Sequence, residues 1–297
     1  MSEYLDPKAD IVFKKIFGDH PLLLISFLNA VLPFESDNEL IIELSYLPTE
    51  QVPEIPEFRR TIADVKCKDR NGRVFIVEMQ MNWTDSFKQR LLFGASQAYV
   101  KQLGRGEEFN LLQPVYGLGI IAEIYEKTIP EWYHHYKLVK NGISGDDIID
   151  HLQLIFIELP KFPVHSSNEK QLRLLWLRFL REIDEKTTTV SKELLDVPEI
   201  AEAITLAKES AYTPSELTIY QSYWDGVSRE KTLMIDKYTE GKAEGKAEGK
   251  AEGKAEGEEL ATHRIAKSML MRGAEINIVM EDTGLTREEI EKIKASI

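Results

Sequence analysis

The stretch from Thr61 to Met81 constrains the fold most, because its side chains alternate in character on both sides of a single turn. Successive side chains of a β-strand point to opposite faces, so this alternation predicts two antiparallel strands rather than a helix. Arg70-Asn71-Gly72 suits a three-residue hairpin loop with glycine in the left-handed conformation. We therefore expect a β-hairpin in which Asp69 pairs with Arg73.

This register divides the hairpin into two faces. The odd-numbered positions are apolar and are expected to pack on the core: Ala63, Val65, Cys67, Phe75, Val77, Met79 and Met81. The other face carries the carboxylates, amines and amide, at Asp64, Lys66, Lys68, Glu78 and Gln80, together with Val74 and Ile76. Asp64 is expected directly opposite Glu78, with Cβ atoms about 4.5–5.5 Å apart, and Lys66 opposite Ile76. Two carboxylates so placed repel each other unless a divalent cation uses both as ligands.

These two acids predict metal-assisted phosphodiester hydrolysis. Asp64 and Glu78, with the backbone carbonyl of Met79, are expected to hold Mg²⁺, or Mn²⁺ or Ca²⁺ in its place. The ion would polarise the scissile phosphate and lower the pKa of a bound water. Gln80 shares the face of Glu78 and is expected to orient that water or a non-bridging oxygen. A hairpin with solvated acidic side chains is the alternative.

A helix is expected from about residue 85 to 103. Its apolar face carries Phe87, Leu91, Ala95 and Ala98, and another face carries Arg90, Gly94, Gln97 and Lys101. Arg90, Gln97 and Lys101 are expected to bind DNA, and Arg90 or Gln97 could instead help to hold the metal-bound water. A solvated helix face accounts for the same residues equally well.

Asp64 followed by Glu78-Met-Gln80 on a hairpin resembles the motif of the PD-(D/E)xK nuclease superfamily. The surrounding sequence is similar to its branch of recombination-promoting nucleases and putative transposases. The residues that carry this resemblance are Asp10-Ile-Val-Phe-Lys-Lys-Ile-Phe-Gly18, Leu28-Asn-Ala-Val-Leu32, Asp64, Ile76-Val-Glu-Met-Gln80, Gln89-Arg90 and Tyr99. It covers most of residues 5–235, and the glycine-periodic segment with its helical tail is also similar to that family.

The resemblance implies a Mg²⁺-dependent DNA endonuclease that promotes recombination or transposition. It also implies Asp10 as a further acidic contributor, although pairing with Lys14 at i+4 explains Asp10 equally well. Two positions depart from the superfamily motif, since Ala63 replaces proline and Gln80 replaces lysine. The missing lysine removes a cation that stabilises developing charge, and Lys66 could substitute for it in part. A catalytically degenerate module that binds DNA or a protein is the alternative function.

Strand and helix patterns are mixed along the first 235 residues. Helices are expected over 6–17, 21–32 and 168–186, with less regular helical patterning to about 238. Strands are expected over 58–69, 73–81, 115–122 and 152–159, and a first strand or a helix–strand junction over 39–47. With the resemblance, this mixture predicts an α/β, restriction-endonuclease-like mixed sheet flanked by helices, with a helical extension. The nuclease-like domain is therefore assigned to residues 1–235.

Residues 236–257 are expected to be a linker, because from Glu240 the sequence repeats Glu-Gly-Lys-Ala four times and ends in Glu-Gly. A period of four gives no Glu–Lys pairs at i+4, and each glycine costs about 1 kcal/mol in a helix. A solvated, extendable segment is one interpretation. A helix whose glycine stripe packs against another chain is the other.

Residues 258–297 predict a small helical unit. One helix spans Ala261 to Arg272 and ends at Gly273, a second begins at Ile276, and Thr286 with Glu289 forms a capping box for a third. The unit resembles the helix-turn-helix domains that bind DNA. A helical dimerisation or packing tail fits the same pattern.

The net charge of −13 argues against a protein that coats DNA through bulk charge, so any DNA contact must be local. Concentration on DNA is then expected to come from assembly, and the chain is predicted to be a homodimer. The tail offers an apolar face for this: Ile265, Met269, Leu270, Ile276 and Val279.

The composition, 43% hydrophobic and 29% charged, is that of a globular protein with a real core. A single cysteine fits a reducing compartment, and no apolar run reaches the roughly 20 residues that span a bilayer. The start of the chain does not resemble a signal peptide. A cytoplasmic protein without a membrane partner is therefore expected.

Three weaker signals are assigned to structure rather than chemistry. Gly117-Leu-Gly-Ile-Ile-Ala122 partly matches a dinucleotide-binding fingerprint, but it lies in a strand-like run. His134-His135 lacks a partner at metal-ligand spacing, and Cys67 is on the apolar face of its strand.

Overall fold

The structure, a computed structural model, describes residues 3–51, 61–140, 148–163 and 171–297. Parts of two expected elements, residues 58–60 and 168–170, lie outside these ranges. The chain falls into two compact units, Met1–Glu230 and Lys231–Ile297. Among the described residues, no helix is both long enough and apolar enough to span a membrane.

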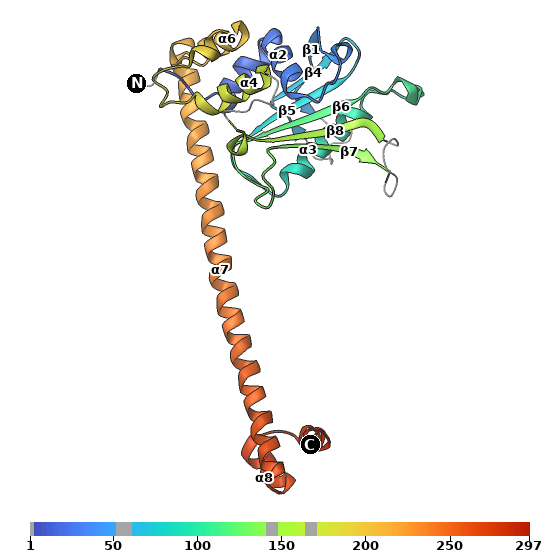
Figure 1. Ribbon diagram of the computed structural model, residues 1–297, viewed down its shortest axis with the longest axis vertical. Helices are drawn as coiled ribbons and strands as arrows, with labels where there is room; N and C mark the ends of the chain where they lie inside the picture. Colours follow the sequence, from blue (N-terminus) through green and yellow to red (C-terminus); the bar gives the residue numbers. More distant parts are fainter. Residues whose placement is uncertain (1–2, 52–60, 141–147, 164–170) are drawn as a thin grey trace. The chain divides into compact units, whose positions relative to one another are not determined.

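The first unit is built on a six-stranded mixed sheet (Figure 1). Its strands, in spatial order, are β1 (Leu44–Tyr46), β4 (Val65–Asp69), β5 (Val74–Gln80), β6 (Val115–Ile121), β8 (Ile148–Glu158) and β7 (Tyr133–Val139). The three central strands β5, β6 and β8 run parallel, and the outer pairings are antiparallel. Two further strands, β2 (Glu50–Gln51) and β3 (Thr61–Ile62), pair with each other. The predicted α/β class is confirmed.

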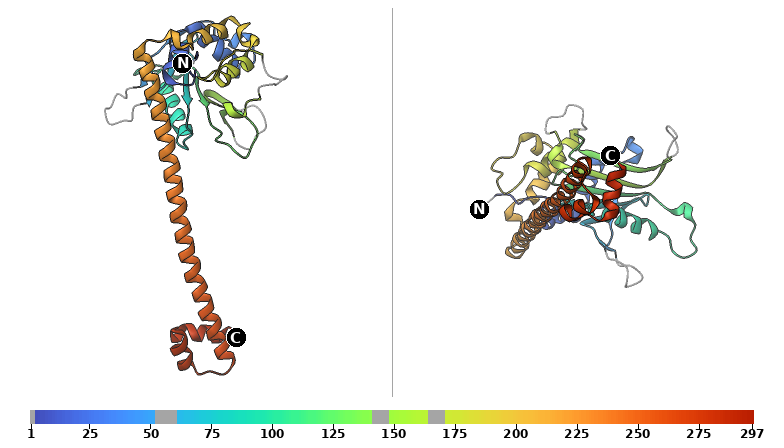
Figure 2. Two further views of the ribbon diagram at one scale, coloured as in Figure 1. Left: turned by 90° about the vertical axis from the view of Figure 1, so that its left-hand side faces the viewer. Right: turned by 90° about the horizontal axis from the view of Figure 1, so that it is seen from below.

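Helices cover both faces of this sheet (Figure 1, Figure 2). One face is covered by α1 (Asp10–Phe13), a π-helical turn (Lys14–Gly18), α2 (Pro21–Val31), α4 (Gln171–Glu182), α5 (Lys192–Leu195) and α6 (Pro198–Leu206). The other face is covered by α3 (Phe87–Val100). Four short 3₁₀ turns complete the described connections: Asp37–Glu39, Phe109–Leu111, Leu159–Lys161 and Glu209–Ala211.

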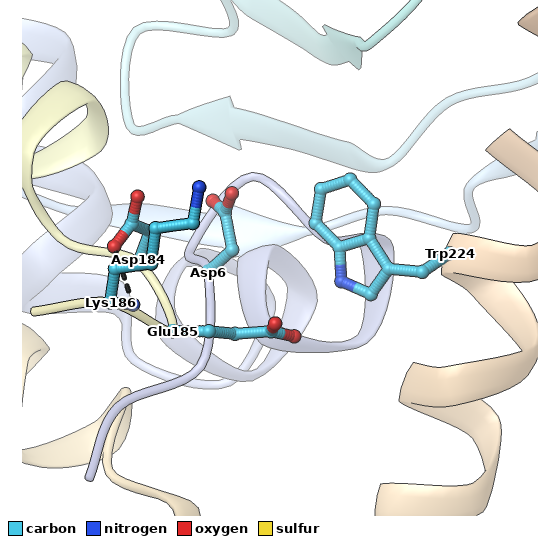
Figure 3. A pocket seen from close by; sticks show the side chains of 5 residues that line it. All are labelled: Asp6, Asp184, Glu185, Lys186 and Trp224. Carbon is cyan, nitrogen blue, oxygen red and sulfur yellow. Dashed lines mark hydrogen bonds between the residues drawn. The ribbon is translucent and has the colours of Figure 1, made fainter. Parts of the chain in front are cut away.

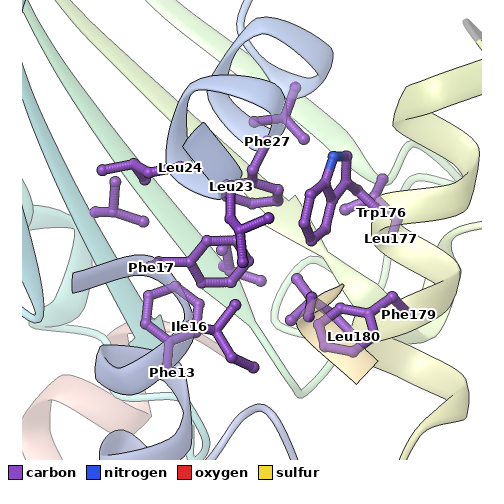
Figure 4. Packing of buried hydrophobic residues seen from close by; sticks show 14 of the residues in the cluster. Phe13, Ile16, Phe17, Leu23, Leu24, Phe27, Trp176, Leu177, Phe179 and Leu180 are labelled. Carbon is purple, nitrogen blue, oxygen red and sulfur yellow. The ribbon is translucent and has the colours of Figure 1, made fainter. Parts of the chain in front are cut away.

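Aromatic side chains fill the core on the first face (Figure 4). Phe17 lies at the centre, with its ring centroid 4.8 Å from that of Phe27 and 5.5 Å from that of Trp176. The Trp176 indole N–H is also satisfied, because it donates to Ser26 Oγ at 3.1 Å. Each such buried aromatic contributes about 1.5–3 kcal/mol of hydrophobic free energy. The packing fixes the first helical turns, which carry Asp10, against the sheet.

On the other face, two glycines of β6 allow α3 to pack closely. A Cβ atom at Gly119 would lie 2.9 Å from Cε1 of Phe87, and one at Gly117 would lie 3.2 Å from Cγ of Leu91. Such approaches leave no room for a side chain. The Gly-x-Gly pattern therefore serves helix–sheet packing. It lies within a strand, as expected.

The hairpin has the predicted turn and register. Asp69 N donates to Arg73 O at 3.0 Å, Gly72 has φ of +86°, and Lys66 pairs with Ile76. The expectation that the even-numbered positions form a polar face is wrong for Val74 and Ile76, which are buried. The reason is α3, which covers that face and confines the polar groups to the strand ends.

Several element boundaries differ from the sequence prediction. The strand expected over 58–69 is interrupted at Ala63 and Asp64, between β3 and β4. The first helix begins at Asp10 rather than at residue 6, and the strand expected over 39–47 shrinks to β1. Strand β7 was not predicted, because its outward-facing side chains are largely exposed or polar and give no apolar run.

Residues 240–257 are helical and lie within α7 (Pro214–Met271), with exposed side chains throughout. The extended form of the linker is therefore wrong, whereas packing of the glycine stripe against another chain stays a prediction. Helices α8 (Ile276–Thr283) and α9 (Arg287–Ala295) follow. The capping box at Thr286 and Glu289 is confirmed.

The second unit has a small core of its own. Ala266, Val279 and Ile290 are fully buried, and Met269, Leu270 and Ile276 pack against them. Ile265, expected on the same apolar face, is 53% exposed and lies outside this core.

Candidate active site

Asp64 lies in a bend directly before β4. The strand ladder begins at Val65, which pairs with Val77, so Asp64 is not paired directly opposite Glu78 as expected. Instead its Oδ2 accepts the backbone N–H of Met79 at 2.6 Å. The bend turns the carboxylate toward the backbone of β5 while keeping it at the end of the hairpin.

Burial raises the pKa of Asp64 to about 6. The hydrogen bond from Met79 and the charge of Lys14 lower this pKa, while the neighbouring Asp10 raises it. Burial likewise raises the pKa of Glu78, to about 7, with Arg90 acting against the shift and Asp64 adding to it. For each carboxyl group, the nearby positive charge is therefore too small to offset the effect of burial on its pKa.

Asp10 joins this group from the first helix. Its Oδ1 lies 2.8 Å from Lys14 Nζ, and both side chains are 41% exposed. It also lies close enough to Asp64 to raise the pKa of that carboxyl group by charge and by a side-chain hydrogen bond. The ion pair with Lys14 and the position beside Asp64 are both present.

Gln80 and Arg90 extend the site from β5 to α3. Arg90 Nε lies 3.8 Å from Glu78 Oε2, and Arg90 Nη2 donates to Gln80 Oε1 at 2.5 Å. Gln80 Nε2 donates to the backbone carbonyl of Asn82 at 2.5 Å. The structure thus brings the predicted Glu78, Gln80 and Arg90 into one connected group.

The remaining predicted cations lie elsewhere. Burial lowers the pKa of the half-buried Lys66, and the nearby Lys101 lowers it further. Lys101 is eleven residues beyond Arg90, or about 16 Å along the helix axis, with Gln97 between them. Gly94, expected on the same face, is buried. Of the predicted DNA-binding residues, Arg90 lies beside a carboxylate of this group, that of Glu78.

Asn82 and several residues of α7 near the site were not singled out from the sequence. Asn82 is 4% exposed and donates to the carbonyl of Val227 at 3.2 Å and to Glu230 Oε2 at 2.9 Å, both on α7. Burial raises the pKa of Tyr223, also on α7, and the charges of Asp64 and Asp10 raise it further. The one sequence signal for Asn82 is its position two residues after Gln80. The residues of α7 carry no such signal, because they are more than 140 positions away.

A cavity of about 180 Å³ is separate from this group (Figure 3). It is lined by Asp6, Asp184, Glu185, Lys186 and Trp224. Figure 3 shows the Trp224 indole facing the acidic side chains across it. Asp64 and Glu78 are not part of this lining.

The residues set aside in the sequence have structural partners. His134 Nε2 lies 2.8 Å from Glu158 Oε1, and His135 Nε2 lies 2.8 Å from Gln153 Oε1. Cys67 is fully buried, as expected for the apolar face of its strand.

The carboxylates of Asp64 and Glu78 fit an ion such as Mg²⁺, which takes few of its ligands from the protein. Within the described ranges, no three Asp, Glu, His or Cys side chains converge closely enough to hold an ion together. Mg²⁺ usually keeps several waters and is bound through one or two carboxylates together with phosphate oxygens of the substrate. Asp64 and Glu78 supply two such carboxylates, and both lack a full set of cationic partners.

A mixed sheet with helices on both faces, carrying acidic residues where β4 and β5 diverge, defines a restriction-endonuclease-like α/β fold. The chain belongs to the PD-(D/E)XK nuclease family transposases, whose family model matches residues 7–233. Residues 259–295 match the C-terminal helix-turn-helix domain of the Rpn/YhgA-like nuclease family, which suggests DNA binding. Neither the curated proteins nor the solved structures gave a match.

Proposed function

We propose that this protein is a Mg²⁺-dependent DNA endonuclease that promotes recombination or transposition. The observation that carries the proposal is the joint burial of Asp64 and Glu78 at the open end of the hairpin, in a chain of the nuclease family. Buried carboxylates with raised pKa values and few cationic partners are typical of sites that await a positive ligand. Mn²⁺ or Ca²⁺ is proposed to bind the same two residues.

The protein residues have distinct tasks in this proposal. The N–H of Met79 fixes the Asp64 carboxylate, so that one of its oxygens is oriented before any ion binds. Glu78 supplies the second carboxylate, and the carbonyl of Met79 is proposed as a further ligand. A bound divalent ion supplies polarisation of the scissile phosphate and activation of the attacking water. Asp10 adds negative charge beside Asp64 and would help to retain the cation.

A plasmid-nicking assay tests the proposal. Purified protein is incubated with supercoiled DNA in Mg²⁺ or in EDTA, and the same assay is run with Asp64→Asn and Glu78→Gln. We expect nicked DNA only with wild-type protein and Mg²⁺. Cleavage that persists in EDTA, or at the wild-type rate in either variant, would contradict the assignment.

The alternative is a module on the nuclease fold that binds without cutting. One observation favours it, namely that the amide of Gln80 is engaged at both ends and no lysine stands in its place. DNA binding by a wild-type protein that leaves DNA intact in Mg²⁺, Mn²⁺ and Ca²⁺ would establish this alternative.

We further propose that the chain acts as a homodimer, because one hydrolytic centre cuts one strand. The single chain has a mass of 34.1 kDa, and sedimentation is expected to return about twice that value. A monomer at tens of micromolar would show that this part is wrong. The cytoplasmic location expected from the sequence stays a prediction, to be checked with a fluorescent fusion.

A further inference from the structure

The amide of Gln80 is oriented by its two neighbours. Its Nε2 can only donate and meets the carbonyl of Asn82, whereas its Oε1 can only accept and meets the guanidinium of Arg90. A flipped amide would place donor against donor at Arg90. In this arrangement the side chain of Gln80 is directed at Arg90.

Arg90 is held on two further sides. Its Nε lies 3.8 Å from Glu78 Oε2, and its guanidinium carbon lies 5.1 Å from the centre of the Phe87 ring. The side chain nevertheless stays 46% exposed. The guanidinium thus lies beside a metal-binding carboxylate with much of its surface open to an incoming phosphate.

Asn82, whose backbone carbonyl accepts the hydrogen bond from Gln80, is itself held in place by α7. The side chain of the buried Asn82 donates to the Val227 carbonyl and to Glu230 Oε2. These contacts attach Asn82 to the first part of α7. Hydrogen bonds thus connect α7 to Asn82, Asn82 to Gln80, and Gln80 to Arg90.

From this geometry we infer that Arg90 supplies the cation that the lysine supplies in the superfamily motif, and that Gln80 is a positioning residue for Arg90. The inference rests on the proposed function, and it replaces the expected action of Gln80 on water. The target of Arg90 is a non-bridging oxygen of the scissile phosphodiester. A guanidinium stays protonated at all working pH values, so its contribution is electrostatic rather than proton transfer.

The test is a set of five variants assayed for single-turnover nicking in Mg²⁺ at saturating DNA. Arg90→Ala should lower the rate about 100-fold, the usual cost of losing one charge-stabilising donor. Gln80→Ala should lower it about tenfold, and the double variant Gln80→Ala/Arg90→Ala should be no slower than Arg90→Ala alone. The fourth variant, Arg70→Ala, removes an exposed arginine at the other end of the same hairpin and serves as the control, with an unchanged rate.

The fifth variant is Gln80→Lys in the Arg90→Ala background, which restores the superfamily lysine. It should recover at least tenfold in rate, whereas a merely structural role for Arg90 would not be rescued by this change. DNA affinity measured in EDTA gives a second readout, since Arg90→Ala should lower the salt dependence of binding by about one phosphate contact. Thermal unfolding of each variant checks that the fold is retained.

The outcomes separate this inference from the proposed function. Arg90→Ala at the wild-type rate, or losses for Gln80→Ala and Arg90→Ala that multiply in the double variant, would overturn the inference while leaving a nuclease. A wild-type protein that never nicks DNA would overturn both.

Discussion

The two ends of one hairpin use buried carboxylates in opposite ways. At the turn, Asp69 is 4% exposed, and its Oδ1 accepts the backbone N–H groups of Asn71 and Arg73. Its Oδ2 lies 2.7 Å from Arg73 Nε, and Arg73 in turn donates to the carbonyl of Glu39. Both buried charges at this end, Asp69 and Arg73, therefore have partners.

At the open end the carboxylates lack comparable partners. Asp64 has one backbone donor, and Glu78 has Arg90 at the longer distance of 3.8 Å. Burial consequently raises both pKa values, to about 6 and about 7. The difference shows that burial of an acid alone does not indicate a functional site. The open end differs from the turn in its shortage of donors around the buried acids, and it is there that we propose the active site.

The largest expected effect is on cleavage at the open end. Asp64→Asn and Glu78→Gln should each reduce the rate about 1,000-fold or more, equivalent to about 4 kcal/mol of activation free energy. The reason is loss of a charged ligand with little change in volume. Nicking assays with circular dichroism spectra measure both rate and fold. Retention of the wild-type rate in either variant would show that the difference between the two ends of the hairpin has no bearing on cleavage.

At the turn the expected effect is on stability. Asp69→Ala should lower the free energy of unfolding by about 3 kcal/mol, because Arg73 is left as a buried charge without its carboxylate. Urea unfolding measures the loss, and Arg70→Ala in the same turn is the exposed control, expected within about 0.5 kcal/mol of wild type. Equal stability of Asp69→Ala and wild type would show that the ion pair is not structural.

A smaller change of opposite sign is expected at the open end. In EDTA at pH 8, Asp64→Asn should raise the free energy of unfolding by about 1–2 kcal/mol, since it removes a buried charge that opposes folding. Mg²⁺ should raise the melting temperature of the wild-type protein and not that of the variant. Destabilisation by Asp64→Asn in EDTA would place Asp64 in the same class as Asp69.

The pH dependence of metal-free stability should distinguish the ends further. Asp64 and Glu78 have folded pKa values of about 6 and 7, above their unfolded values near 4. At these two groups the folded state therefore holds more protons in this window, so their contribution to stability falls as pH rises from about 4 to 7. Comparison of wild type with Glu78→Gln by urea unfolding across this range should show a smaller fall in the variant, by about 1 kcal/mol. Identical curves would contradict the raised pKa of Glu78.

The smallest effect on either end of the hairpin is expected from truncation at Glu240. Both ends belong to the first unit, so the shortened protein should unfold within about 0.5 kcal/mol of the full chain and still cut at high enzyme concentration. DNA binding should weaken. A folded, truncated protein that binds Mg²⁺ but cuts at no concentration would make the C-terminal unit part of the chemistry.

Local patterns in the sequence determined much of this molecule. Alternation and Asn71-Gly72 specified the hairpin and its register, because a strand has a period of two and this loop requires a left-handed glycine. Helical spacing specified the buried face of α3, and the capping box located the start of α9. Asp64, Glu78 and Gln80 were found because they lie close together in sequence.

Tertiary structure decided which of these groups act together. The burial of Ile76 depends on α3, the helix that follows β5 in the chain and packs on the same face of the sheet. The orientation of Asn82 depends on its hydrogen bond to Glu230 of α7. The bend at Asp64 and the approach of Arg90 to Gln80 are likewise products of packing. Hydrogen bonds between distant residues leave no periodic pattern in the sequence. The sequence therefore predicted the acidic residues, and only the fold showed that Arg90 is the cation beside Glu78.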